Sequence, residues 1–265
     1  MRILLANDDG VHAPGLQTLR KTLEKIAEVI VVAPLEERST TGHTLTLDSP
    51  LRLVEIEKNV YGCSGYPADC TLMGLAHILK DNKPDLVVSG INRGANLGQD
   101  IFYSGTVAAA REACFRHTPA IAVSSVVDFI QPRPKSADEE LFQTAADFIC
   151  EILQSNCLSY FSGKELLNVN VPNLTREDLK GAQMTTLGFR NYSEDILERR
   201  DFRDRKYYWI GGVYKGFEMV HNSDCHVVDE GKISITCLDL NSHNSNQEAD
   251  PKRWMPFFER FKNWK

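Results

Sequence analysis

The segment Asn7-Asp8-Asp9-Gly10, with two adjacent carboxylates, directly follows the short apolar run of residues 3–6. Like charges this close together are costly unless a cation lies between them or one carboxyl takes up a proton. A hard divalent cation held by oxygen ligands satisfies both carboxylates. A purely structural interpretation also fits, in which an Asp side chain caps a turn at a strand end and Gly10 supplies the positive φ. The pair alone does not decide between a metal site and a turn.

Three further segments offer the groups that a cation and a phosphate bind. Residues 37–43 hold three hydroxyl side chains and a glycine, and can supply a neutral oxygen ligand. Residues 89–98 place Asn92 and Asn96 among glycines, which permit close backbone approach, and an Asn amide oxygen suits a hard cation. Residues 103–106 open an expected helix, whose N terminus favours an anion. The structural alternatives are an ordinary Ser/Thr loop, a flexible connector and a Ser N-cap.

Together these segments supply two carboxylates, a hydroxyl, an amide and an anion-binding helix start. This set fits one hard cation and one phosphate, and oxygen-only ligands favour Mg²⁺, Mn²⁺ or Ca²⁺ over zinc. Such a cation activates water and offsets charge on phosphoryl oxygens. The sequence therefore predicts metal-assisted hydrolysis of a phosphomonoester, with Asp8 or Asp9 as the candidate base.

The elements around these residues alternate between strand-like and helix-like patterns. Strands are expected at residues 2–6, 29–33, 44–47, 51–56, 86–88, 120–123 and 167–171. Helices are expected to begin near Pro14, Pro67 and Ser104, and at a capping box formed by Ser136 and Glu139. Uninterrupted apolar strands alternating with helices predict an α/β fold, with a mostly parallel sheet covered by helices on both faces.

The pattern changes after about residue 180. Residues 205–210 and 232–240 are typical of strands in a different, antiparallel element. Residues 241–250 are polar, and aromatic side chains then recur at helical spacing at Trp254, Phe257, Phe258, Phe261 and Trp264. This much aromatic surface near a chain terminus needs a partner, either its own domain or a second subunit.

The bulk composition limits the classes of partner. The chain has 265 residues, a net charge of −6 and a sequence pI of about 5.7. This balance argues against binding of a nucleic-acid polymer but leaves a small phosphorylated ligand open, because a bound metal reverses the local sign. Seven cysteines without a CxxC motif indicate reduced thiols. The N-terminal apolar run is too short for a signal peptide, and no stretch resembles a membrane span, which predicts a soluble, cytoplasmic protein without membrane contact.

Several motifs occur in one order and spacing: Asn7-Asp8-Asp9-Gly10, Glu37-Arg38-Ser39, Gly42-His43, Pro67-Ala68-Asp69-Cys70, Ser89-Gly90-Ile91-Asn92-Arg93-Gly94, Asn96 and Tyr103-Ser104-Gly105-Thr106. In this set the sequence resembles the SurE family of metal-dependent nucleotide phosphatases. The similarity continues through Asn168-Val169-Asn170-Val171-Pro172, Tyr207-Tyr208-Trp209-Ile210-Gly211 and Ser234-Ile235-Thr236. It covers about residues 1–240.

The resemblance implies a Rossmann-like catalytic domain over residues 1–180 and a hairpin extension over residues 181–240 that is exchanged between subunits. The aromatic arm of residues 241–265 lies outside it. The implied activity is that of a 5′-nucleotidase acting on nucleoside monophosphates, in some members also a 3′-nucleotidase and exopolyphosphatase. The implied assembly is a homodimer or homotetramer. Cys225, His226 and Cys237 depart from the family pattern, which puts the details of the exchange in question.

Carried over by motif, the implied metal ligands are Asp8, Asp9, Ser39 and Asn92, holding one divalent cation per subunit, Mg²⁺ or Mn²⁺. The residues implied near the phosphate are Asn96, Ser104, Gly105 and Thr106. His43 lies in a site loop and either contacts the substrate, as a ligand-orienting group or an acid, or is an ordinary loop histidine.

Three alternatives remain open from the sequence. One is a covalent aspartyl-phosphate route, as in haloacid-dehalogenase-like enzymes, although those place their acids as Asp-x-Asp. The second is an Mg²⁺-binding phospho-acceptor domain like a response-regulator receiver, although the later strand here ends at Asn92 rather than at an Asp. The third is a nucleotide-binding protein without catalysis.

Overall fold

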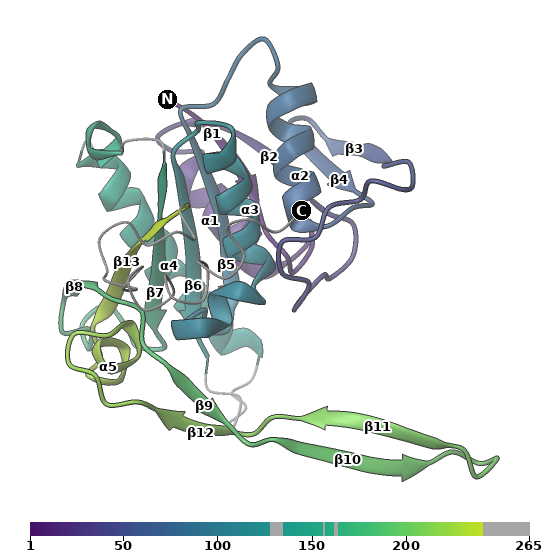
Figure 1. Cartoon of the computed structure of the whole chain (residues 1–265). Coiled ribbons are helices and arrows are strands. Elements are labelled where there is room, and N and C mark those ends of the chain that lie inside the picture. Colours follow the sequence, from purple (N-terminus) through teal and green to yellow (C-terminus); the bar gives the residue numbers. More distant parts are fainter. Residues whose placement is uncertain (128–134, 156, 162–163, 241–265) are drawn as a thin grey trace, which may run out of the picture.

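The computed structural model describes residues 1–127, 135–155, 157–161 and 164–240. In these ranges the main sheet has nine strands in the order β3-β4-β2-β1-β5-β6-β7-β13-β8 (Figure 1). Their bounds are β1 Arg2–Ala6, β2 Glu28–Pro34, β3 Leu53–Glu57, β4 Val60–Cys63, β5 Leu86–Arg93, β6 Ala120–Val126, β7 Glu165–Pro172, β8 Ala182–Thr185 and β13 Ile233–Asp239. Strands β4, β2, β1, β5, β6 and β7 run parallel, whereas β3 and β13 are antiparallel to their neighbours β4 and β7.

Helices cover both faces of this sheet because its central strands are apolar on both sides. On β1, Ile3 and Leu5 pack into one core with α1 (Pro14–Leu23) and α4 (Lys135–Gln154). Leu4 points to the other face and packs into a second core with α2 (Pro67–Met73) and α3 (Gly105–Phe115). The α/β fold expected from the sequence is confirmed.

Short helical segments complete the described part of the chain. A π-helical turn, η1 (Gly74–Ile78), continues α2, and a 3-10 turn, η2 (Gly98–Phe102), precedes α3. A second 3-10 turn, η3 (Cys157–Tyr160), follows α4, and α5 (Asp224–Asp229) precedes β13. No helix among the described residues is long and apolar enough to cross a membrane.

In the region after β2, one predicted strand is wrong and one strand was not predicted. Residues 44–47, expected as a strand, belong to a loop whose Thr46 N–H donates to the Asp69 carboxylate at 3.0 Å. The strand β4 was not expected, because its four residues Val60–Cys63 include a glycine and carry little periodic signal. Pairing with β2 and β3 makes β4 a strand, and tertiary contacts override weak local preference here.

The C-terminal part differs from expectation in one strand. Residues 232–240 were expected in a separate antiparallel element, but β13 joins the main sheet between β7 and β8. Alternation along a strand predicts a strand but not the sheet to which it belongs. The strand expected at residues 205–210 is confirmed as β11 (Lys206–Gly211), which pairs antiparallel with β10 (Asp195–Arg200).

The β10–β11 hairpin projects away from the body of the molecule (Figure 1). Its root is a second short ribbon of β9 (Arg190–Tyr192) and β12 (Tyr214–Phe217), which lies near the carboxyl ends of the parallel strands. Helix α4 begins at Lys135, so Ser136 lies inside it, and the side chains of the expected capping pair are outside the described residues. The expected aromatic helix of residues 254–264 also lies outside them.

Candidate active site

The candidate site lies where the strand order of the sheet reverses. Strands β1 and β5 are neighbours, and the chain leaves β1 toward β2 on one side and β5 toward β6 on the other. A crevice opens at such a switch point, beyond the carboxyl ends of the strands, and ligands bind there in open α/β sheets. Asp8 and Asp9 follow β1, and Asn92 is the last residue but one of β5.

The turn after β1 is held by Asn7 rather than by either aspartate. The Asn7 side chain donates from Nδ2 to the Gly10 carbonyl at 2.9 Å, and Gly10 has a φ of 103°. Only glycine adopts this conformation without strain. The turn expected from the sequence is therefore present, but it uses neither carboxylate, and both remain for another task.

Asp8 is held against the first turn of α3. Its side chain is buried, at 4% exposure, and the Thr106 hydroxyl donates to its Oδ1. Burial raises the pKa of Asp8, and hydrogen bonds from Thr106 and Gly105 oppose that rise. Gly105 permits the contact, because a Cβ on it would lie 2.8 Å from the Asp8 Cβ. The helix start that the sequence assigned to a phosphate thus already binds the Asp8 carboxylate.

Asp9 lies beside Asp8 at the mouth of the crevice. Burial, the negative charge of Asp8 and that of Glu37 together raise the pKa of Asp9 to about 7, against weaker opposition from the Arg93 N–H. That N–H donates to Asp9 Oδ2 at 3.3 Å, a long hydrogen bond. A divalent cation between the two carboxylates would remove the repulsion and favour their charged forms.

Two neutral oxygens complete a ligand set suited to a hard cation. Asn92 donates from Nδ2 to the Gly94 carbonyl at 2.8 Å, which fixes the amide and leaves its Oδ1 as an acceptor. Ser39 donates its hydroxyl to Glu37 Oε1 at 2.8 Å, which leaves the lone pairs of Ser39 Oγ available. Two carboxylates, an amide oxygen and a hydroxyl fit Mg²⁺ or Mn²⁺ by ligand chemistry.

A cavity of about 1180 Å³ joins these residues to others from distant parts of the chain. Of the residues implied by the family motifs, those lining it are Asp8, Asp9, Ser39, Asn92, Asn96 and Ser104. Gly105 and Thr106 are not among its lining residues and lie behind Asp8 instead. The structure brings most of the predicted site together in one hollow.

His43 is a third predicted site residue that does not line the cavity, and its contacts are with α3. Its Nε2 lies 3.1 Å from Glu112 Oε2, and its ring stacks on Phe115 with centroids 5.4 Å apart. It is not among the residues that line the cavity. A substrate contact for His43 stays a prediction.

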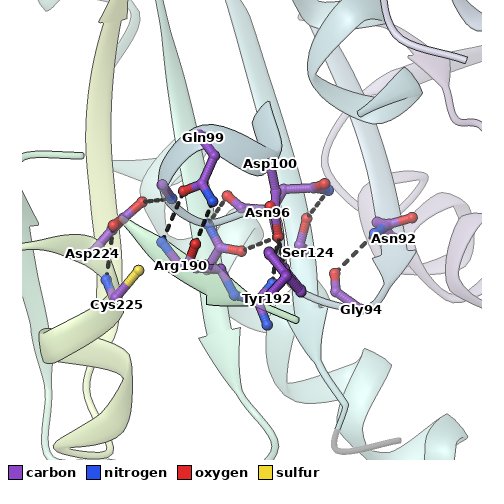
Figure 2. Close-up of polar contacts among 12 residues, drawn as sticks. Asn92, Gly94, Asn96, Gln99, Asp100, Ser124, Arg190, Tyr192, Asp224 and Cys225 are labelled. Carbon is purple, nitrogen blue, oxygen red and sulfur yellow. Dashed lines mark hydrogen bonds and ion pairs between the residues drawn. The ribbon is translucent and has the colours of Figure 1, made fainter. Parts of the chain in front are cut away.

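A buried polar layer beneath the crevice fixes the loop that carries Asn96. The Asn96 N–H donates to Asn170 Oδ1 at 2.8 Å, and its carbonyl accepts from Asn168 and Asn170 at 2.8 and 3.0 Å. The Asn96 amide donates to Ser124 at 2.8 Å (Figure 2). Buried polar groups are retained where they are hydrogen-bonded. Sequence reasoning did not predict this layer, although the two asparagines within the otherwise apolar run of residues 166–171 in β7 are a signal that could have found it.

Sequence reasoning missed three other residues that line the cavity, Asp100, Arg190 and Tyr192. Asp100 lies in η2, and the other two lie on β9 at the root of the hairpin (Figure 2). Arg190 Nη1 lies 2.5 Å from Asp100 Oδ2, and the Tyr192 hydroxyl donates to the same oxygen. Ninety positions separate Asp100 from Arg190, and no local pattern links them.

His221, Cys225 and His226 are potential soft-metal ligands close together in the sequence, but they form no metal-binding group in the described part of the chain. The His221 and His226 rings lie edge-on with centroids 5.6 Å apart. No group of three or more His, Cys, Asp and Glu side chains in the described ranges is arranged to hold a metal ion. The oxygen site at Asp8 and Asp9 therefore depends on neutral ligands as well as carboxylates.

Fold and site define a class: an α/β protein with paired carboxylates and neutral oxygen ligands at the switch point of its sheet. The chain belongs to the SurE family, since the family model described as "Survival protein SurE" matches residues 3–194.

Relatives and a solved structure agree with this assignment. The chain is 44% identical to "5′-nucleotidase SurE" of Geotalea daltonii over 257 residues, covering 97% of this chain and 100% of that protein. It is 42% identical to the protein of the same name from Aliivibrio fischeri, with 92% of each chain covered. The crystal structure of SurE protein from Aquifex aeolicus matches with a TM-score of 0.81 at 34% identity, covering 99% of this chain and 100% of that one.

Proposed function

We propose that this protein is a divalent-cation-dependent 5′-nucleotidase, which hydrolyses nucleoside monophosphates to a nucleoside and phosphate. The observation that carries the proposal is the Asp8–Asp9 pair at the switch point, with free acceptors on Asn92 and Ser39 beside it. The names of the relatives support the same activity. A receiver-like phospho-acceptor or a non-catalytic nucleotide binder is not favoured by these relatives.

One cation per subunit, Mg²⁺ or Mn²⁺, would be held by Asp8, Asp9, Ser39 and Asn92. When bound, it supplies an acidified water and neutralises charge on the phosphoryl oxygens. Thr106 and Gly105 orient Asp8 for this task, by a hydrogen bond and by leaving room for the carboxylate.

Ser104 and Asn96 are the proposed phosphate contacts. Ser104 Oγ accepts the Val107 N–H at 3.0 Å, which leaves its O–H free to donate. Asn96 uses one N–H of its amide on Ser124, and the second remains available. Both residues line the cavity next to the carboxylates. Fixed donors aimed at phosphoryl oxygens stabilise the charge that develops in the transition state.

Asp9 is the proposed acceptor of the proton that the attacking water loses. Asp8 is committed to Thr106 and the first turn of α3, whereas Asp9 accepts only the long hydrogen bond from Arg93 in the described structure. A carboxylate with free lone pairs beside the phosphate is suited to general-base catalysis.

The test is phosphate release from 5′-AMP by the wild-type protein and by Asp9→Asn. After treatment with a chelator, we expect turnover to stop and to return with Mn²⁺ or Mg²⁺. Asp9→Asn is expected to lose most of the activity in either ion. Unchanged turnover without divalent ions would overturn the proposal. A trapped phosphoenzyme that disappears in Asp8→Asn would replace the water route by an aspartyl-phosphate route.

We also propose a homodimer or homotetramer in which the β10–β11 hairpin is exchanged between subunits. The hairpin carries exposed apolar side chains, among them Phe202, Trp209 and Ile210, the last 91% exposed. An exposed apolar patch of this kind marks an interaction surface. Light scattering after size-exclusion chromatography is expected to give a multiple of the 29.8 kDa chain mass, and a smaller species for Trp209→Glu. A monomeric wild-type protein would contradict this assembly.

A further inference from the structure

The wall of the cavity carries a further carboxylate, Asp100, in addition to Asp8, Asp9 and Glu37. Its side chain is 20% exposed and lines the cavity together with Arg190 and Tyr192 (Figure 2). Both hydrogen bonds that fix it, from Arg190 Nη1 and from the Tyr192 hydroxyl, go to Oδ2. No donor among the described residues forms a hydrogen bond with Asp100 Oδ1, so this oxygen keeps its lone pairs for a ligand.

The charges around Asp100 do not favour a second phosphate site there. Arg190 is paired with Asp100 at 2.5 Å, and its guanidinium lies over the Tyr214 ring at 4.4 Å from the centroid. The positive charge of Arg190 is thus already neutralised, and an additional phosphate would face the negative charge of Asp100. A carboxylate oxygen in a cavity wall instead suits a hydrogen-bond donor on the ligand.

The ion pair is held rigidly by a second pair of hydrogen bonds. Gln99 Nε2 donates to the Arg190 carbonyl at 2.5 Å, and the Arg190 N–H donates to Gln99 Oε1 at 2.8 Å. These reciprocal bonds join η2 to β9 and fix the direction of the Asp100 carboxylate. Arg190 and Tyr192 are therefore positioning residues for Asp100.

If the function proposed above holds, a nucleotide with its phosphate between Asn96, Ser104 and the cation extends its sugar into this cavity. We infer that Asp100 Oδ1 accepts a hydrogen bond from the ribose 2′-hydroxyl and makes the site selective for ribonucleotides over deoxyribonucleotides. The ribose directly follows the phosphate in the substrate and is the first donor-bearing group beyond it. An acidic side chain accepting a ribose hydroxyl is the arrangement used in dinucleotide-binding α/β folds.

The experiment compares kcat/KM for 5′-AMP and 5′-dAMP, with p-nitrophenyl phosphate as a sugar-free substrate. One hydrogen bond to a charged acceptor predicts that the wild-type protein prefers 5′-AMP by about tenfold or more. The AMP-to-dAMP ratio is expected to fall toward one in Asp100→Ala. In Tyr192→Phe, which keeps the carboxylate but loosens it, the ratio is expected to fall less. Losses common to all substrates cancel in this ratio.

Asp195→Asn, which removes a carboxylate from the exposed strand β10, is the matched control and should keep the wild-type ratio. Inhibition of wild-type turnover by adenosine and by 2′-deoxyadenosine provides a readout that needs no variant, with adenosine expected to be stronger.

Equal wild-type kcat/KM values for the two nucleotides, or a ratio that survives Asp100→Ala, would overturn the assignment of Asp100. A change in the AMP-to-IMP ratio in place of the AMP-to-dAMP ratio would overturn it too, by moving the contact to the base. If the wild-type protein releases phosphate from none of these substrates with Mg²⁺ or Mn²⁺, the proposed nucleotidase function itself fails. The two failures are therefore distinguishable.

Discussion

Gly105→Ala is a single-methyl perturbation of the contact between α3 and the Asp8 carboxylate. The added Cβ would lie 2.8 Å from Asp8 Cβ and 2.9 Å from Pro67 Cγ, so one of these buried groups has to shift. Overpacking of this kind costs about 1–3 kcal/mol. Alanine in place of glycine in a helix returns about 0.5–1 kcal/mol. We expect a net loss of unfolding free energy of up to about 2.5 kcal/mol in the cation-free protein.

The larger effect is expected on cation binding. A shift of Asp8 by a few tenths of an ångström misaligns a proposed ligand, and loss of such supporting contacts typically weakens metal affinity by about 10–100-fold. Isothermal titration with Mn²⁺ and urea unfolding in chelator measure the two quantities. Gly212→Ala is the matched control, because its Cβ would approach no atom closer than 3.8 Å. If Gly105→Ala binds Mn²⁺ as tightly as both the wild type and the control, the assignment of Asp8 is refuted.

Three further predictions follow from the same contacts. The pKa of Asp9 is raised from its ordinary value of 3.8 to about 7 in the folded protein. Its contribution to stability is therefore fully present below pH 3.8 and is lost as the pH rises through 7. In urea unfolding, the cation-free wild-type protein should lose stability over this pH range, and Asp9→Asn should lose less. Thr106→Val removes the hydroxyl bonded to Asp8 and should weaken Mn²⁺ binding about tenfold by titration, and unchanged affinity would contradict that role. Asn170→Ala removes two hydrogen bonds to the Asn96 backbone and should lower the free energy of unfolding by about 1–3 kcal/mol. It should also raise KM for 5′-AMP, and an unchanged KM would show that this layer does not position Asn96.

The central part of the fold was predictable because its strands are buried on both faces. A short, uninterrupted apolar run such as residues 3–6 is typical of a strand buried on both faces, and β1 (Arg2–Ala6) contains it. The site could be predicted for a related reason. Parallel strands bring the residues at their carboxyl ends to one edge of the sheet. Asp8 and Asn92 therefore line the same cavity, although 84 positions separate them in the sequence.

What the sequence could not supply was pairing between distant segments. Residues 232–240 had the alternation of a strand, but nothing local indicated that β13 lies between β7 and β8. The ion pair of Asp100 with Arg190 depends on the β9–β12 ribbon lying against η2, which is a tertiary property. The start of α3 was predicted as an anion site, and its contact with the Asp8 carboxylate depended on the path of the chain.

We propose that one divalent cation between Asp8 and Asp9 offsets the repulsion between their two negative charges. The most direct measurement is the anomalous scattering of crystals of the protein soaked in manganese. We expect one strong peak per subunit, in contact with oxygens of Asp8, Asp9 and Asn92. Crystals that show no peak beside this pair, at a manganese concentration that supports phosphate release, would contradict it.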